Sequence, residues 1–303
     1  MPVNFSDTLV VGISSRTLFN LEAEEGLFQT EGIDAYRKIQ KARENDVLEP
    51  GTAFYLVKAL LNLNKLCTTQ RLVEVIVMSR NSPETGVRVL NSIKELKLDI
   101  TRSAFTGGEA IAPYMEAFGI DLFLSKNEED VQSVIDSKTA AAAIILDPPE
   151  TMNSDTSTVR IAFDADAVLF SEESELIYKT QGIEAFAKNE EENAQVPLKE
   201  GPHAKFLRTL SKIQAHMTEA GDIESTPIRI AIVTARNSPS HMRVINTLRN
   251  WNVYIDEAFF LGGISKDKVL KAFNAHIFFD DQDVHLQDAS KMVASGKVPI
   301  PKK

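Results

Sequence analysis

The sequence predicts an α/β protein built from two tandem Rossmann-like halves, each with a parallel sheet flanked by helices, and a small helical cap in the second half. Three observations predict this fold. The chain repeats itself once, each copy alternates short apolar runs with amphipathic stretches, and a polar segment with prolines separates the copies. We therefore expect a first half at residues 1–150 and a second half at 151–303, with the cap at about 171–226.

The repeat is clearest between Val77–Pro83 and Val233–Pro239, which share the run Arg-Asn-Ser-Pro. Four further matches keep the same order in both copies: Gly32–Tyr36 with Gly182–Phe186, Leu48–Gly51 with Leu198–Gly201, Arg88–Asn91 with Arg243–Asn246, and Phe105–Gly108 with Phe260–Gly263. Five ordered matches indicate a duplicated unit. Residues 147–158, which contain two adjacent prolines and several small polar residues, indicate the linker between the copies.

The alternation of elements is clearest in the second copy. Three short apolar runs are typical of buried parallel strands: Val159–Phe163, Ile228–Val233 and His276–Phe279. Two helices are expected between them. His203–Met217 carries its apolar residues on one face, and Ser238-Pro239 predicts an N-cap and a first-turn proline for a helix over Met242–Trp251. This order predicts right-handed crossovers and a ligand site at the carboxyl ends of the strands.

The segment between the first two strands of the second copy predicts the cap. Its acidic run Asn189–Glu192 is typical of a solvated helical face, and Gly201-Pro202 predicts a break that acts as a hinge. Closure of such a cap excludes water from a site at the strand ends.

The composition excludes several classes of protein. The chain of 303 residues has 33 basic and 43 acidic side chains and a net charge of −10, so we expect neither a nucleic-acid nor an anionic-membrane partner. The single Cys67 excludes an intrachain disulfide and a cysteine-based zinc site. The N-terminal residues do not resemble a signal peptide, and no apolar run approaches the roughly 20 residues of a membrane span. We expect a cytoplasmic protein.

Chemically active side chains follow the expected strands of the second copy. Asp164 and Asp166 come directly after the first strand, Thr234 and Lys266 follow along the chain, and the pair Asp280-Asp281 ends the last strand. A parallel sheet brings these positions to one edge. Carboxylate oxygens there are typical ligands for Mg²⁺, which also binds phosphate, and an aspartate can attack phosphorus. The set predicts metal-assisted phosphoryl transfer.

These residues also carry a resemblance to known proteins. Their order resembles the four motifs of the haloacid dehalogenase superfamily of phosphohydrolases. Three longer stretches resemble the cytosolic type I 5'-nucleotidases: Ile161–Ser171, Val233–Arg236 and His276–Gln282. The similarity reaches the first half through Ile13–Phe19 and Thr106–Gly108, and so covers nearly the whole chain.

The resemblance implies Mg²⁺-dependent hydrolysis of nucleoside 5'-monophosphates, AMP first among them, through an aspartyl-phosphate. By motif position, Asp164 is the nucleophile. Asp166 is the general acid and base, and its backbone carbonyl contacts the metal. Asp281 is the expected metal ligand of the last pair, with Asp280 beside it.

Substrate phosphate is expected to contact four residues: Thr234, Ala235, Arg236 and Lys266. Thr234 and Lys266 stabilise phosphoryl charge, although Lys268 is an alternative to Lys266 because it lies only two residues away. For Arg236, a phosphate contact and a helix cap are both open. The sequence does not identify the cap side chains that contact the base.

Alignment of the two copies indicates that the first half has lost the chemistry. It places Asp164 opposite Ile13, Asp166 opposite Ser15, Thr234 opposite Met78, Lys266 opposite Ile111, and Asp280-Asp281 opposite Ser125-Lys126. We therefore expect a non-catalytic first half and a catalytic second half. Members of the resembled family are activated by nucleoside diphosphates, so a phosphate-bearing effector is expected near Ser14, Ser15, Arg80 and Lys126.

Two other functions remain open. One is a phosphatase for another small phosphomonoester, such as a sugar phosphate, because the core chemistry would be the same. The other is a non-catalytic protein that senses nucleotides with both halves. Assembly into a homo-oligomer is also expected.

Overall fold

The structure is a computed structural model that describes residues 5, 7–67, 69–218 and 226–302. The strands of the first half are β1 (Leu9–Ile13), β2 (Val73–Ser79), β3 (Arg102–Phe105), β4 (Leu122–Ser125) and β5 (Ala141–Ile145). Its helices are α1 (Ser15–Leu18), α2 (Glu22–Glu31), α3 (Ile33–Ala42), α4 (Phe54–Leu63), α5 (Val87–Glu95), the short η1 (Ala112–Tyr114), α6 (Met115–Phe118) and α7 (Glu128–Ser137).

The second half follows the same plan. Its strands are β6 (Val159–Phe163), β7 (Ile228–Thr234), β8 (Glu257–Phe260), β9 (Ile277–Asp280) and β10 (Ser295–Lys297). Its helical elements are the turn η2 (Ala165–Leu169), α8 (Glu173–Gln181), α9 (Ile183–Glu192), α10 (Ala204–Thr218), α11 (His241–Asn250), α12 (Asp267–Phe273) and α13 (Asp283–Met292). One detail of the prediction is wrong. Helix α11 begins at His241 with Ser240 as its N-cap, so Pro239 precedes the helix rather than standing in its first turn.

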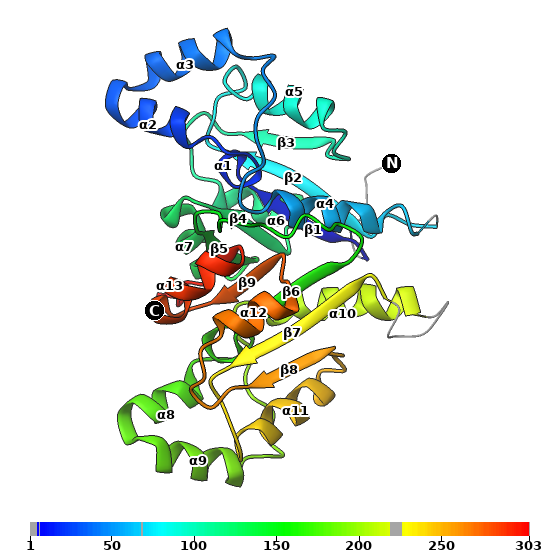
Figure 1. Cartoon of the computed structure of the whole chain (residues 1–303), viewed down its shortest axis with the longest axis vertical. Coiled ribbons are helices and arrows are strands. Elements are labelled where there is room, and N and C mark those ends of the chain that lie inside the picture. Colours follow the sequence, from blue (N-terminus) through cyan, green and yellow to red (C-terminus); the bar gives the residue numbers. More distant parts are fainter. Residues whose placement is uncertain (1–4, 6, 68, 219–225, 303) are drawn as a thin grey trace.

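All ten strands within the described residues join in one sheet, in the order β3-β2-β1-β4-β5-β10-β9-β6-β7-β8 (Figure 1). Neighbouring strands are parallel except at the centre, where β10 pairs with β5 in antiparallel orientation. The predicted α/β class with a mostly parallel, helix-flanked sheet is therefore confirmed. The two sets of strands form a single sheet rather than two separate ones.

Alternate residues along the strands point to opposite faces of the sheet, and helices cover both faces. On one face, a single apolar cluster runs through both halves and includes residues of α4, α5, α10 and α11. On the other face, α6 and α7 cover the first-half strands, whereas α12 and α13 cover those of the second half. The halves therefore share part of one hydrophobic core.

Backbone pairing corrects the alignment of the two copies. The amide of Ser14 donates to Leu124, and the amide of Asp164 donates to Phe279, the matching residue of β9. Ser14, not Ile13, is thus the counterpart of Asp164. In the same way Ser79 pairs with Phe105, and Thr234 pairs with Phe260, which is the residue that matches Phe105 in the second copy. Ser79, not Met78, therefore corresponds to Thr234.

The alignment at Asp164 is wrong because the turn after β6 holds one extra residue. The first-half turn closes with the Phe19 amide donating to Ser15, four residues back, whereas the Phe170 amide donates to Ala165, five residues back. The extra residue brings Ala167 to a φ of 57°, in the left-handed region that side chains other than glycine rarely adopt. Counted from the strand end, Arg16 now corresponds to Asp166.

Each half also extends a helical hairpin beyond the sheet, α2–α3 in one and α8–α9 in the other, at opposite ends of the molecule (Figure 1). Gly32 and Gly182 connect the two helices of each hairpin with φ values of 81° and 86°, a conformation that favours glycine. In the described part of the segment 171–226, α8 and α9 form this hairpin. Helix α10 instead buries Phe206 and Leu207 in the shared core.

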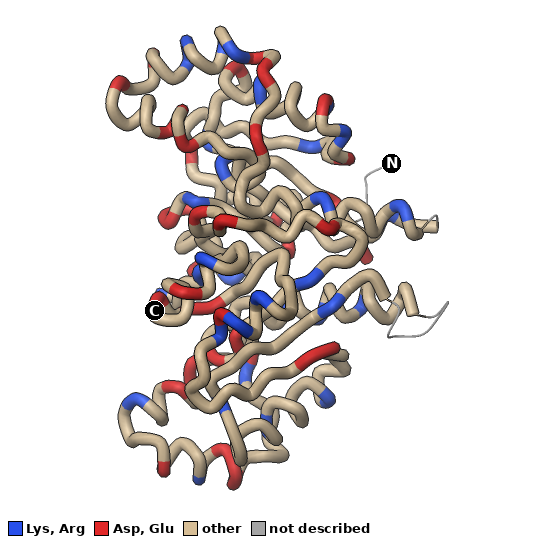
Figure 2. The backbone as a smooth tube through the Cα atoms, viewed as in Figure 1, with Lys and Arg blue, Asp and Glu red and all other residues tan. Residues whose placement is uncertain are grey.

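No helix within the described residues is long and apolar enough to span a membrane. Lys and Arg lie interspersed with Asp and Glu along both halves (Figure 2).

Candidate active site

The residues singled out in the second half lie at the carboxyl ends of adjacent strands. Asp164 follows β6, Thr234 ends β7, and Asp280 ends β9 and is followed by Asp281. Lys266 directly precedes α12 at its N-cap position, and its carbonyl oxygen accepts the amide of Leu270. This is the edge at which a parallel sheet gathers ligand-binding side chains, because all its strands end there.

Three carboxylates meet at this edge. One oxygen each of Asp164, Asp280 and Asp281 lies within 4.8 Å of the other two. The Oδ1 atom of Asp281 is buried and has no hydrogen-bond partner among the described residues. A buried carboxylate oxygen without a partner is costly unless a cation or donor satisfies it. The donor set therefore fits a hard divalent cation such as Mg²⁺.

Lys266 lies between two of these carboxylates. Its Nζ donates to Asp164 Oδ1 and to Asp280 Oδ2, both at 2.7 Å. Its side chain is almost fully buried, whereas Lys268 is exposed, so Lys266 is the lysine that contacts the carboxylate cluster. Asp280 also accepts the amide of Gln282 at 2.8 Å and lies 3.2 Å from His285 Nδ1.

The electrostatics of the cluster follow from burial and crowding. Burial raises the pKa of Asp164 to about 7; Lys266 opposes this rise, and the charges of Asp280 and Asp166 add to it. Burial together with Asp164 and Asp280 raises the pKa of Asp281 to about 8. Close carboxylates cannot all ionise without a compensating cation, and a divalent ion would supply that compensation.

Asp166 lies apart from this trio and takes part in a second network. Arg236 donates to both of its carboxylate oxygens, through Nη2 at 2.6 Å and Nε at 2.7 Å. The same guanidinium donates to Glu190, which also accepts from Arg243 at 2.8 Å and from Ser174 at 2.8 Å. Of the four aspartates expected at the metal, the Asp166 side chain is therefore the one that lies outside the carboxylate cluster.

Glu190 corrects the prediction of a solvated face at Asn189–Glu192. It is fully buried between Arg236 and Arg243, and these two cations offset the effect of burial and lower its pKa. Sequence reasoning missed it because a run of acidic residues usually faces water. A signal was present, since Glu190 lies one helical turn after Phe186 and shares its face.

The other expected substrate residues lie beside this network. Thr234 is buried, and its hydroxyl accepts the amide of Arg236 at 3.3 Å. Ala235, between them, is exposed. Within the described part of the chain, the hydrogen bonds of the buried Arg236 side chain go to Asp166 and Glu190 rather than to a helix end. Its guanidinium lies 5.4 Å from the ring centre of Phe186 on the α8–α9 hairpin. Phe186 in turn packs edge to face with Tyr178, with ring centres 6.1 Å apart.

Further residues that the sequence did not single out complete the site. Glu175 of α8 accepts from Gln282 at 2.9 Å and from Lys179 at 2.6 Å, and its charge contributes to the raised pKa of Asp281. The sequence pattern does not reveal this contact, because Glu175 lies more than a hundred residues before Asp281, whose pKa it affects.

The residues expected to bind an effector also come together. Ser14, Ser15, Arg80 and Lys126 line one cavity in the first half. Effector binding there stays a prediction.

Comparison with known proteins gives a consistent picture. The family model for 5'-nucleotidases matches residues 1–303. The human protein cytosolic 5'-nucleotidase 1B is 35% identical over 297 residues, which cover 96% of this chain and 48% of the human protein. The chain thus spans about half the length of the curated relative that it matches. No solved structure matches the chain.

Proposed function

Because the chain belongs to the 5'-nucleotidase family, we propose that it hydrolyses nucleoside 5'-monophosphates to nucleoside and phosphate, with AMP as the foremost substrate and Mg²⁺ as the cofactor. The observation that carries the proposal is the carboxylate cluster of Asp164, Asp280 and Asp281 beside the buried ammonium of Lys266. The human relative is about twice as long as this chain. The activity and the substrate of the whole protein are therefore both part of the proposal.

The first step is a displacement at phosphorus by Asp164. One of its oxygens is held by Lys266, which leaves the other free to attack. Attack forms the bond from Asp164 to phosphorus while the bond from phosphorus to the 5'-oxygen breaks. When bound, Mg²⁺ would be held by Asp164, Asp281 and Asp280 and would offset the repulsion between carboxylate and phosphate. Lys266 and Thr234 stabilise the charge on the phosphoryl oxygens.

Asp166 is the general acid and base of the proposed reaction. In the first step it donates a proton to the leaving 5'-oxygen, and in the second it accepts one from the water that attacks the aspartyl-phosphate. That water releases phosphate and restores Asp164. Arg236 holds the Asp166 carboxylate in this structure. We propose that Arg236 transfers its hydrogen bonds to the substrate phosphate, which frees Asp166 to carry the proton.

The rings of Phe186 and Tyr178 provide the apolar contact for the base. Phe186 lies over the guanidinium of Arg236, the side chain assigned to phosphate, so a nucleotide that bridges them brings its base to this hairpin. Planar aromatic rings stack on bases of any sequence. This supports a nucleotide over a sugar phosphate, which has no planar group for such a surface.

The proposal also includes the organisation that the sequence predicted: a non-catalytic first half at 1–150, a catalytic second half at 151–303, a nucleoside diphosphate activator, a homo-oligomer and a cytoplasmic location. The name of the human relative includes the word cytosolic, which supports the last point. Phosphate release with and without ADP tests activation, and light scattering tests assembly.

The decisive experiment measures phosphate release from 5'-AMP, other 5'-nucleotides, 3'-AMP and a sugar phosphate, with Mg²⁺ or with EDTA. Release from 5'-nucleotides that requires Mg²⁺ is expected. Preferred release from the sugar phosphate would instead favour a phosphatase of another specificity, and binding without any release would favour a nucleotide sensor.

Replacement of Asp164 by Asn tests whether Asp164 is the nucleophile. The amide keeps the size of the side chain but cannot attack phosphorus, so release should fall at least about a thousandfold. Asp288→Asn, on the exposed side of α13, is the matched control and should retain wild-type release. An Asp164→Asn protein as active as the wild type would eliminate Asp164 as the nucleophile.

A further inference from the structure

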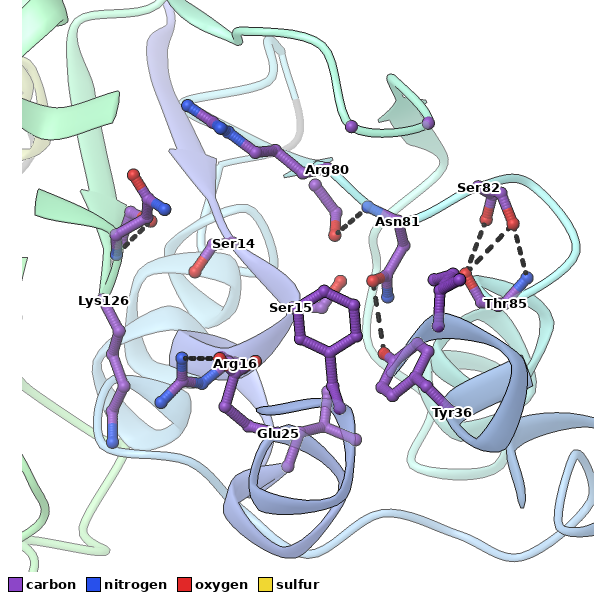
Figure 3. Close-up of a pocket in the computed structure, with 18 of the residues that line it drawn as sticks. Ser14, Ser15, Arg16, Glu25, Tyr36, Arg80, Asn81, Ser82, Thr85 and Lys126 are labelled. Carbon is purple, nitrogen blue, oxygen red and sulfur yellow. Dashed lines mark hydrogen bonds and ion pairs between the residues drawn. The ribbon is translucent and has the colours of Figure 1, made fainter. Parts of the chain in front are cut away.

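The first half holds a cavity of about 470 Å³ at the carboxyl ends of its strands (Figure 3). Ser14 and Ser15 lie near its centre, with Lys126 on one side and Tyr36 of the α2–α3 hairpin on the other. The cavity is within the size range of pockets for small molecules. It occupies the same place in the first half as the candidate active site does in the second.

The corrected register gives the first-half counterparts of the catalytic residues. Asp164, Asp166, Asp280 and Asp281 correspond to Ser14, Arg16, Ser125 and Lys126, and all four counterparts line the cavity. Thr234 corresponds to Ser79, which keeps a hydroxyl, and Lys266 corresponds to Ile111. Four carboxylates have thus become two hydroxyls and two cations. The charge at the strand ends changes from negative to positive, so an anion needs no divalent cation to approach.

Lys126 supplies a fixed positive charge at the place of Asp281. Its ammonium donates to Glu22 at 2.8 Å and to Asp147 at 2.7 Å, which leaves a third proton for a ligand. The Asp147 carboxylate is 88% exposed and that of Glu22 is 42% exposed, so both can exchange this contact for water when an anion binds.

Two buried donors at this place have no partner. The Ser15 hydroxyl belongs to a residue that is 3% exposed, and it makes no hydrogen bond within the described part of the chain. The Nε of Arg16 is also buried and unpaired there. Both residues line the cavity, and buried donors of this kind are normally satisfied by a ligand or water.

An aromatic pair lies on the outer side of the cavity. Phe28 and Tyr36 pack edge to face with ring centres 5.9 Å apart, and the Tyr36 hydroxyl donates to Asn81 at 3.2 Å. The second-half hairpin carries the corresponding pair, Tyr178 and Phe186, at 6.1 Å. The anionic end and the aromatic end of the second-half site therefore both have counterparts in the first half.

We propose that this cavity binds a nucleotide without a divalent cation and does not hydrolyse it, with the phosphate at Lys126, Ser14 and Ser15 and the base at Phe28 and Tyr36. The choice of a nucleotide rests on the function proposed for the second half. Binding needs no metal because Lys126 and Arg16 replace the carboxylates that would repel phosphate. The bound nucleotide is not hydrolysed, because Ser14 occupies the position of Asp164 and Arg16 that of Asp166.

Isothermal titration calorimetry on the full chain in EDTA tests the proposal, with AMP, inorganic phosphate and adenosine as separate ligands. Without a metal the second half lacks the divalent cation that would join its carboxylates to a phosphate, so binding there is suppressed. We expect one AMP per chain, at least tenfold weaker binding of phosphate and of adenosine, and no release of phosphate from bound AMP.

Two variants, each with a different side chain of the cavity replaced, test whether AMP binds there. Lys126→Gln removes the fixed cation, and Ser14→Asp restores a carboxylate, so each should weaken AMP binding in EDTA at least tenfold. Lys94→Gln on the exposed side of α5 removes a cation away from the cavity and should bind AMP as the wild type does. Thermal denaturation of each variant establishes that it is folded.

Three results would overturn the proposal: no AMP binding in EDTA, wild-type binding by both folded variants, or adenosine binding as tight as AMP binding. None of these concerns the second half. Conversely, a wild-type protein that releases no phosphate with Mg²⁺ but binds AMP in EDTA would reject the proposed activity and leave this site standing.

Discussion

Glu190 is the buried carboxylate on which the geometry around Arg236 depends. It contacts Arg236 and Arg243, and Arg236 in turn holds Asp166. Among the described residues, Arg236 has Asp166 as its second carboxylate partner, whereas Arg243 pairs with Glu190 alone. One side chain on the hairpin therefore orients the proposed phosphate contact and the proposed acid of the reaction.

Glu190→Gln should lower the free energy of unfolding by about 3 kcal/mol, because it leaves two guanidinium groups without their buried counter-charge. Chemical denaturation measures the change. Glu192→Gln is the control, since Glu192 is exposed and forms a surface pair with Lys188 at 3.8 Å; its effect should stay below about 0.5 kcal/mol. Equal effects of the two replacements would contradict a structural role for Glu190.

His203 is a second buried residue with a consequence for stability. Its ring lies among Phe163, Phe206 and Phe279, and neither nitrogen has a hydrogen-bond partner in the described residues. Burial lowers the pKa of His203 to about 3, below the ordinary value of 6.5. The folded protein therefore keeps this ring neutral where the unfolded chain protonates it.

The resulting pH dependence has a definite sign. Above pH 6.5 both states are neutral and the stability is fully present; as the pH falls from 6.5 towards 3, the unfolded state takes up a proton and stability is lost at up to about 1.4 kcal/mol per pH unit. His203→Leu should remove this contribution. Denaturation curves at pH 7.5 and pH 5 measure it, and an identical loss in both proteins would disprove it.

At the scale of elements, the turn η2 is fixed by close packing against the start of α10. A Cβ atom at Gly201 would lie 2.4 Å from the Phe170 carbonyl oxygen and 2.6 Å from that of Val168. Gly51 makes the equivalent approach to Thr17 in the first half, at 2.6 Å. Backbone atoms cannot yield as a side chain can, so these glycines fix the turns that follow β1 and β6.

Gly201→Ala should therefore displace η2 and with it Asp166. We expect a loss of about 2 kcal/mol of stability and a lower kcat, measured by denaturation and by phosphate release. Gly26→Ala in α2 is the control. Nothing lies within 4 Å of its Cβ position, and a helical alanine should add about 0.5 kcal/mol. A stable and fully active Gly201→Ala protein would show that η2 tolerates the shift.

At the scale of the whole molecule, the continuous sheet couples the two halves. The β5–β10 pair joins them, and one apolar cluster includes residues from both. Polar contacts add to this, since Asn62 of α4 donates to Thr156 at 3.1 Å and Gln132 of α7 donates to the carbonyl oxygen of Ile300 at 3.1 Å. Unfolding one half would expose the core of the other.

The protein should therefore unfold in one transition, and a change at the seam should affect both halves. A Cβ at Gly296 would lie 3.0 Å from Ala143 and from Phe279, so Gly296→Val should destabilise the protein by about 2 kcal/mol. Hydrogen exchange should then quicken in both β2 and β7. Loss of protection in β7 alone, or two calorimetric transitions, would mean that the halves unfold independently.

The α/β class, the five ordered repeats and the strand-end aspartates could be predicted from the sequence, because hydrophobic periodicity and the residues after each strand are local properties. The strands Val159–Phe163 and Ile228–Val233 were predicted to within one residue. The alignment of the copies at Asp164 was not. A single extra residue in η2 changes the register, and only the pairing of β6 with β9 reveals it.

Thus the chain's local pattern determined which kinds of element form and which side chains end them. The tertiary structure alone decided that ten strands form one sheet, that Glu190 is buried, and that Lys126 stands at the place of Asp281. The physical reason is that burial and charge pairing depend on partners far away in the chain. Glu190 meets Arg236 across 46 residues and Lys266 meets Asp164 across 102, distances over which a sequence pattern carries no geometry.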